Sequence, residues 1–107
     1  MSSNRHEITS VEQHERHEGE TLSTRDHDVI QRWATERGGT PVVVEGTERS
    51  ESAGVLRIDF EKPNDRLEPV SWDDWFTTFD DRGLDFVYQE HRSDGRPSTF
   101  FRLVTSD

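Results

Sequence analysis

The sequence predicts an α+β domain over residues 22–107, with the element order α-β-β-α-β-β. Three observations predict this fold: two segments with helical spacing of apolar residues, four segments with strand-like patterns, and an Asp94-Gly95 pair between the last two strands. Each element has one apolar side to bury. An antiparallel-rich, four-stranded sheet with both helices on one face would bury those sides together.

The first predicted helix follows Ser23-Thr24-Arg25-Asp26, a pattern typical of a capping box. The spacing of the next apolar residues places them in one stripe on a helix: Val29, Ile30, Trp33 and Ala34. Gly38-Gly39 predicts the end of this helix.

Two strands are predicted after this helix. The first is the β-branched run 42–44, followed by a polar loop over residues 45–53. In the second, Leu56, Ile58 and Phe60 alternate with Arg57 and Asp59, the pattern of a half-buried strand. A loop is predicted over residues 61–69 because of Pro63-Asn64-Asp65.

The second predicted helix begins at another capping box, Ser71-Trp72-Asp73-Asp74. An aromatic stripe follows at helical spacing and is expected to lie in the core: Trp72, Trp75, Phe76 and Phe79. Gly83 is the expected terminating residue.

The last two strands, within residues 84–92 and 97–104, flank Asp94-Gly95, which favours a two-residue type I′ hairpin turn. This turn would place Tyr88 opposite Phe101 and Phe86 opposite Leu103. All four would then face the core, so the turn and the hydrophobic pattern agree. Pro97 requires an edge strand or an outward-pointing position.

Residues 1–21 are predicted to be a disordered, acidic, His-containing tail. The larger apolar residues of the first 22 positions are only Met1, Ile8, Val11 and Leu22. Such a segment buries too little apolar surface to offset the entropy lost on ordering.

The charge of the chain restricts its partners. There are 23 acidic and 13 basic residues, a formal net charge of −10, and a single lysine, Lys62. An acidic surface opposes binding to nucleic-acid phosphates and to anionic membranes. It suits a basic partner, or a salt-rich cytoplasm that screens the repulsion, as in halophilic adaptation. The chain has no cysteine, no signal-like N-terminus and no long apolar run, so a cytoplasmic location is expected.

Motifs for chemistry are weak. His14-Glu15-Arg16-His17-Glu18 is one residue short of the His-Glu-x-x-His spacing and lies in the predicted tail, so no metal site or cofactor is expected. Asp26-His27-Asp28 is expected to be a solvated first helical turn. His91 beside the hairpin turn indicates nothing specific. No catalytic residue and no enzymatic activity are expected.

The expected binding surface is the second face of the sheet. Val87, Phe100 and Val104 would emerge there beside Arg57, Asp59 and Arg102, as an apolar strip with a charged rim. The alternative is that Phe100 only fills space between strands. Two further candidates are an exposed Trp72, which could contact a ligand or carbohydrate, and an acidic patch around the second helix, which could mimic nucleic acid or hold a basic protein. The patch comprises Asp73, Asp74, Asp80, Asp81 and Asp85, and its alternative is a solvated helix face.

Several segments together resemble a family of short, uncharacterised bacterial and archaeal proteins: residues 24–39, 54–60, 71–76 and 87–90. Some members of that family carry the label 1,4-α-glucan branching enzyme. Branching enzymes use a (β/α)₈ barrel of about 250 residues, which a chain of 107 residues cannot form. The resemblance therefore implies at most a detached accessory module. Together these observations predict a small interaction or stress-accessory domain that binds a protein, or itself, around Phe100.

Overall fold

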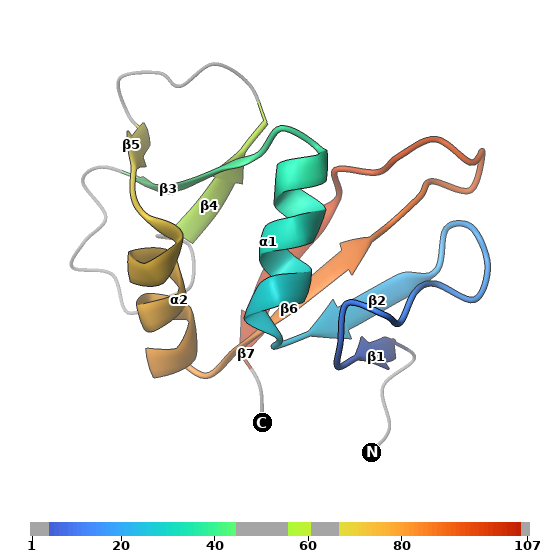
Figure 1. Cartoon of the computed structure of the whole chain (residues 1–107), viewed down its shortest axis with the longest axis horizontal. Coiled ribbons are helices and arrows are strands. Elements are labelled where there is room, and N and C mark those ends of the chain that lie inside the picture. The colour runs from blue at the N-terminus through green and yellow to red at the C-terminus, as the bar shows by residue number, and fades with distance from the viewer. Residues whose placement is uncertain (1–4, 45–55, 61–66, 106–107) are drawn as a thin grey trace.

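The structure is a computed structural model that describes residues 5–44, 56–60 and 67–105, and these residues form an α+β fold (Figure 1). Along the chain the elements are β1 (His6–Ile8), β2 (Thr21–Thr24), α1 (His27–Glu36), β3 (Thr40–Val44), β4 (Leu56–Asp59), β5 (Leu67–Pro69), α2 (Trp72–Asp81), β6 (Leu84–Gln89) and β7 (Phe101–Thr105).

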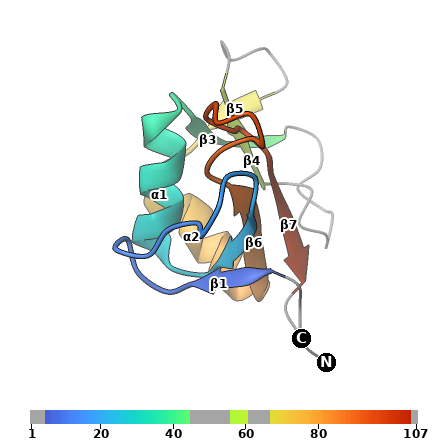
Figure 2. The ribbon, with the colours of Figure 1, turned by 90° about the vertical axis from the view of Figure 1, so that its right-hand side faces the viewer.

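The main sheet has four strands in the order β1-β2-β6-β7. β1 is parallel to β2, whereas the β2–β6 and β6–β7 pairs are antiparallel. Both helices lie on one side of this sheet (Figure 2). The predicted α+β class is confirmed, and the main sheet has the predicted number of strands, but the order and identity of those strands differ from the prediction.

The prediction of a disordered tail over residues 1–21 is wrong for residues 5–21, while residues 1–4 lie outside the described residues. Leu22 of β2 pairs with Tyr88 of β6, and Ile8 of β1 is 1% exposed in the core. The Thr24 hydroxyl donates a hydrogen bond of 2.6 Å to the Ile8 carbonyl. β1 and β2 each carry only one large apolar side chain, so the sequence pattern is too weak to indicate a strand. Pairing of β2 with β6 contributes the additional stabilisation that orders this segment.

The predicted single sheet is also wrong, because β3 and β4 form a second, smaller antiparallel sheet with the order β4-β3-β5. The physical reason is that β2 already occupies the edge of β6 that these strands would need. β5 lies in a region predicted to be a loop, and Val42 pairs with Pro69 there. The loop predicted over residues 45–53 lies outside the described residues.

The two helices begin at capping residues. In α1 the cap is Asp26, whose side chain accepts a hydrogen bond of 3.0 Å from the Val29 amide. The capping box predicted at residues 23–26 is therefore misplaced, since Ser23 and Thr24 belong to β2. In α2 the predicted box is confirmed, with the Ser71 hydroxyl accepting from the Asp74 amide at 3.0 Å.

The core fills the space between the helices and the main sheet. The predicted stripe of α1 is buried in full, and in α2 Trp75, Phe76 and Phe79 are buried. The two buried indoles also hold backbone groups. Trp33 donates to the Gln89 carbonyl at 2.8 Å, and Trp75 donates to the Arg57 carbonyl at 3.0 Å. Trp75 thereby joins α2 to the smaller sheet.

The predicted register of the last hairpin is confirmed, with Tyr88 opposite Phe101 and Phe86 opposite Leu103. Its turn is different. Gly95 donates to the Arg92 carbonyl at 2.8 Å, and Arg92 donates to the Arg96 carbonyl at 2.7 Å, which closes a three-residue loop. A type I′ turn requires a positive φ at both central residues, here Asp94 and Gly95. Gly95 has φ 89°, but Asp94 does not have a positive φ, so the turn is not of type I′.

The three-residue loop changes the pairing near the turn, where His91 lies opposite Pro97. Further along, Tyr88 lies opposite Phe101, so the second strand contains one extra residue between these pairs. An extra residue of this kind is a β-bulge. The bulge offsets the longer turn, which explains why the predicted register was correct although the predicted turn type was wrong.

Candidate functional site

The predicted binding surface is divided between the two sheets. Val87 is fully buried opposite Arg102, Val104 is half-buried, and Phe100 is 44% exposed. Arg57 lies exposed on β4, and its neighbour Asp59 is half-buried there. Phe100, Arg102 and Val104 therefore lie on or next to β7, whereas Arg57 and Asp59 lie on β4 in the other sheet.

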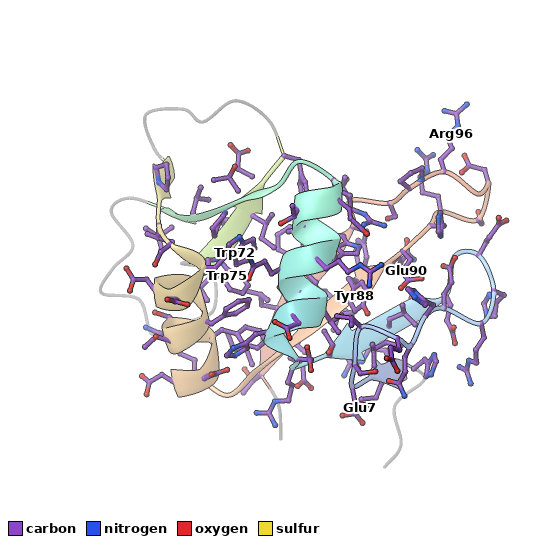
Figure 3. The ribbon with its side chains drawn as sticks, in the orientation of Figure 1. Glu7, Trp72, Trp75, Tyr88, Glu90 and Arg96 are labelled. Carbon is purple, nitrogen blue, oxygen red and sulfur yellow. The ribbon has the colours of Figure 1, made fainter. Side chains whose placement is uncertain are left out.

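Trp72, the residue considered for a ligand or carbohydrate contact, is half-buried beside Trp75 at α2 (Figure 3). Its ring stacks on Phe76 with centroids 5.3 Å apart and meets Trp75 edge-on at 5.6 Å. These contacts make Trp72 part of the aromatic packing around α2, so nothing in the geometry favours a carbohydrate platform.

Two members of the predicted acidic patch have side-chain partners. Asp80 pairs with His27 at 2.9 Å, and Asp85 pairs with Arg25 at 3.3 Å. Asp73 and Asp74 are exposed in the first turn of α2, where the helix dipole stabilises negative charge. Asp81 is also exposed. This arrangement agrees with a solvated helix face.

β7 is an edge strand, because it pairs with β6 on one side and with no other strand of the described chain. The Phe100 carbonyl accepts a hydrogen bond of 3.4 Å from the Gln89 amide of β6. Backbone groups alternate in direction along an antiparallel strand. The amides and carbonyls of Phe101, Leu103 and Thr105 are therefore directed to the open edge.

Two arginines accompany this edge. Arg102 is exposed in β7, and Arg96 is exposed in the hairpin turn, where its side chain points away from the fold (Figure 3). Neither forms an ion pair within the described parts of the chain. Two arginines without an ion-pair partner among the described residues thus lie on either side of Phe100 in the sequence.

A pocket lies between α1, the segment before β2, and the end of β6. It is a pocket of about 280 Å³ with apolar walls that include Trp33 and Tyr88. The Tyr88 hydroxyl is buried without a hydrogen-bond partner, and burial raises the pKa of the phenol well above its usual value. Polar groups also line the pocket, among them His14, Glu90 and His91.

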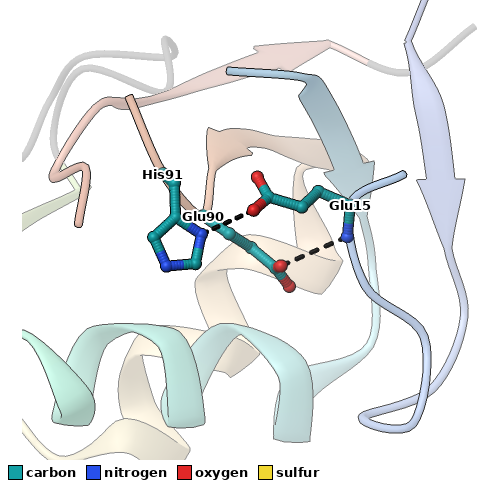
Figure 4. Close-up of side chains that lie close together, drawn as sticks. All are labelled: Glu15, Glu90 and His91. Carbon is teal, nitrogen blue, oxygen red and sulfur yellow. Dashed lines mark hydrogen bonds and ion pairs between the residues drawn. The ribbon is translucent and has the colours of Figure 1, made fainter. Parts of the chain in front are cut away.

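Glu90 and His91 of this pocket come together with Glu15, and we call these three residues the Glu–His cluster (Figure 4). His91 Nδ1 lies 2.5 Å from Glu15 Oε2, and Glu90 Oε1 accepts from the Glu15 amide at 3.2 Å. The other Glu90 oxygen lies 3.1 Å from His14 Nδ1. One oxygen or nitrogen from each member of the cluster lies within 4.8 Å of the others.

Arg37 fixes the backbone beside this cluster. Its guanidinium donates to the carbonyls of Trp33 at 3.0 Å, Ser98 at 2.5 Å and Glu90 at 2.5 Å. Burial lowers the pKa of Arg37. By bonding to both α1 and the two sides of the hairpin, Arg37 holds the end of β6 against the pocket.

The cluster was missed in the sequence because its members are far apart along the chain. Glu15 lies in the segment predicted to be disordered, and the sequence around His91 indicates no specific chemistry. The hairpin pattern could have placed Glu90 and His91 at the end of a strand. No sequence signal places the loop before β2 beside them.

This chain matches no family model, no curated protein and no solved structure in the comparisons made. Within the described ranges, none of the helices has the length and apolar character needed to cross a membrane. The function must therefore be inferred from the geometry of this chain.

Proposed function

We propose that the protein is a non-enzymatic interaction domain that binds an extended, acidic segment of a protein partner along the open edge of β7. The observation that carries this proposal is the exposure of Phe100. Phe100 is 44% exposed, and no other large hydrophobic side chain in the described parts of the chain is exposed. An exposed aromatic side chain beside a free strand edge can anchor a bound peptide, since aromatic residues often supply most of the binding energy at interfaces.

The backbone of β7 provides the second support for the proposal. An extended peptide can add to a sheet edge by pairing with its free amides and carbonyls. Phe101, Leu103 and Thr105 offer such groups over one short strand. β7 contains no Lys or Pro, two residues that commonly protect edge strands from pairing.

The charges around Phe100 indicate the chemistry of the partner. Arg96 and Arg102 lack ion-pair partners in the described chain, and both are exposed. An acidic peptide would meet these two cations, whereas a basic peptide would meet repulsion from them. The bound segment is therefore an extended chain with acidic residues and apolar side chains that contact Phe100.

A direct test uses a short synthetic peptide in which Glu and Val alternate. Its binding to the full chain is followed through backbone amide shifts in nuclear magnetic resonance, at the lowest KCl concentration that keeps the domain folded. We expect shifts along β7 that are lost in Phe100→Asp and in Arg102→Glu. Thr99→Asp is the matched control, because it adds the same charge at a neighbouring exposed position and should retain binding.

Three results would contradict the proposal. The first is the absence of shifts in β7. The second is equal binding of a peptide in which Lys replaces Glu. The third is pairing of β7 with a second copy of the chain without peptide, seen as a dimer in analytical ultracentrifugation that Phe100→Asp abolishes.

A further inference from the structure

We infer that the Glu–His cluster is a binding site for a divalent transition-metal ion, with Glu15, Glu90 and His91 as ligands and His14 as the neighbouring fourth donor. This site is separate from the β7 edge and does not depend on the function proposed for that edge.

The first argument concerns charge. The side chains of Glu15 and Glu90 are only 11% and 17% exposed, yet they lie within 4.8 Å of each other, and Glu90 lines the pocket. Two neighbouring carboxylates that are mostly removed from water repel each other and require a compensating cation. His14 and His91 face them, and the nearby Arg37 guanidinium is already occupied by three carbonyl groups.

The second argument concerns the donor atoms. The cluster presents one imidazole nitrogen and two carboxylate oxygens within 4.8 Å of one another, and the His14 nitrogen lies 3.1 Å from a Glu90 oxygen. Ions such as Zn²⁺ bind imidazole and carboxylate together, usually with four ligands at about 2.0–2.2 Å. Mg²⁺ and Ca²⁺ prefer all-oxygen sites, so the imidazoles favour a transition metal.

The third argument is that polar atoms at the site lack partners. The Oε1 atom of Glu15 is buried and accepts no hydrogen bond, so it has lone pairs for an ion. Tyr88 is only 1% exposed, lines the same pocket, and has a hydroxyl without a partner. A buried hydroxyl of this kind is costly unless it is paired. A water molecule bound to the metal would give it one.

An ion can reach the cluster from solvent. His91 is 40% exposed and His14 is 57% exposed, whereas the carboxylates lie deeper. The imidazoles therefore form the outer side of the site and the carboxylates its inner side. This order allows an ion to enter without unfolding of the surrounding strands.

A metal here would connect two distant parts of the chain. Glu15 lies 76 positions before His91, and their side chains are in direct contact. Bound metal would hold the loop that precedes β2 against the end of β6. The expected consequence is slower amide exchange in residues 9–20 when metal is present.

The test is a titration of the full chain with Zn²⁺ by calorimetry, repeated with Co²⁺ to record its visible absorption spectrum. We expect about one ion per chain. Glu15→Gln and His91→Gln should each weaken binding at least about tenfold, because each removes a direct ligand. His17→Ala is the matched control: His17 is exposed and belongs to the same histidine-containing run, and its imidazole is within hydrogen-bond distance only of the Glu18 carbonyl among the described residues.

Circular dichroism verifies that each variant is folded. If a variant unfolds, amide and side-chain shifts of the wild type on Zn²⁺ addition locate the ion independently, and they should centre on residues 14–15 and 88–91. Two results would overturn the inference. One is a folded wild type that binds no Zn²⁺ at micromolar concentration. The other is binding that His17→Ala weakens as much as Glu15→Gln, since that pattern indicates only adventitious binding by the histidine-containing run.

Discussion

The regions on the two sides of helix α1 are stabilised by different interactions. On one side α1 packs into the aromatic core, where Trp33, Trp75 and Phe86 are almost completely buried. On the other side, residues 5–20 are attached to the end of β6 and to each other largely by charged and polar pairs. These pairs include His14–Glu90, His91–Glu15 and Arg16–Glu20.

The difference teaches how each region depends on its surroundings. Apolar burial is insensitive to pH and to bound ions, and it supplies most of the folding free energy. Ion pairs contribute less, and their contribution changes with protonation, salt and metal. The aromatic core thus maintains the fold, whereas the N-terminal segment can respond to solution conditions. Within this segment, Ile8 is buried in the core and Val11 packs against the core.

The largest expected effect is in the aromatic core. Trp75→Ala removes a fully buried indole and its hydrogen bond to the Arg57 carbonyl. We expect a loss of about 3–5 kcal/mol in the free energy of unfolding, measured by denaturant titration. The exposed neighbour Asp73→Ala should change it by less than about 0.5 kcal/mol. Equal small effects of both changes would show that α2 does not pack as described.

The next effect tests whether the N-terminal segment shares the core. Ile8→Ala should lower the free energy of unfolding by about 2–5 kcal/mol, because Ile8 is 1% exposed. Glu7→Ala, the adjacent exposed residue of β1, is the control and should have little effect. If Ile8→Ala also leaves the free energy of unfolding unchanged, β1 is a detachable tail and does not share the core.

The smallest expected effect appears only in acid. A hydrogen bond from Arg16, assisted by the charges of Arg16 and His6, lowers the pKa of Glu20 from 4.5 to about 2. The folded state therefore prefers ionised Glu20 more than the unfolded chain does. Its stabilising contribution is complete above pH 4.5 and disappears as the pH falls towards about 2.

Glu20→Gln should remove this part of the pH dependence. Thermal unfolding measured between pH 5 and pH 2 should show a shallower loss of stability in the variant than in the wild type. Glu18→Gln changes an exposed neighbour and should leave the wild-type slope. Identical slopes for the wild type and Glu20→Gln would show that the Arg16–Glu20 pair does not hold this loop.

The same contrast explains which features the sequence could predict. The stripes of α1 and α2 are local, periodic and strongly apolar, so the sequence predicted their buried residues. The pairing of Tyr88 with Phe101 followed from alternation, although the turn was wrong, because a bulge offset the longer loop. β1 and β2 carry mainly polar residues, and only their pairing across the sheet reveals Ile8 and Leu22 as core residues.

The candidate sites differ in the same way. Phe100 was predicted as a contact residue from the strand pattern, and the structure supports its exposure. Its predicted neighbour Arg57 belongs to another sheet, because a polar strand, β2, occupies the edge of β6. The Glu–His cluster depends on contacts between residues about 75 positions apart, and neither composition nor spacing indicates such contacts.

The central claim is that residues 5–24 belong to the folded domain and complete the pocket at the end of β6. Native-state hydrogen exchange of the full chain tests it most directly, by comparing the amides of β2 that pair with β6 with those of β6 that pair with β7. We predict that both sets open with similar free energies, as parts of one cooperative sheet. Exchange in β2 at the rate of an unfolded peptide, while β6 remains protected, would contradict the claim.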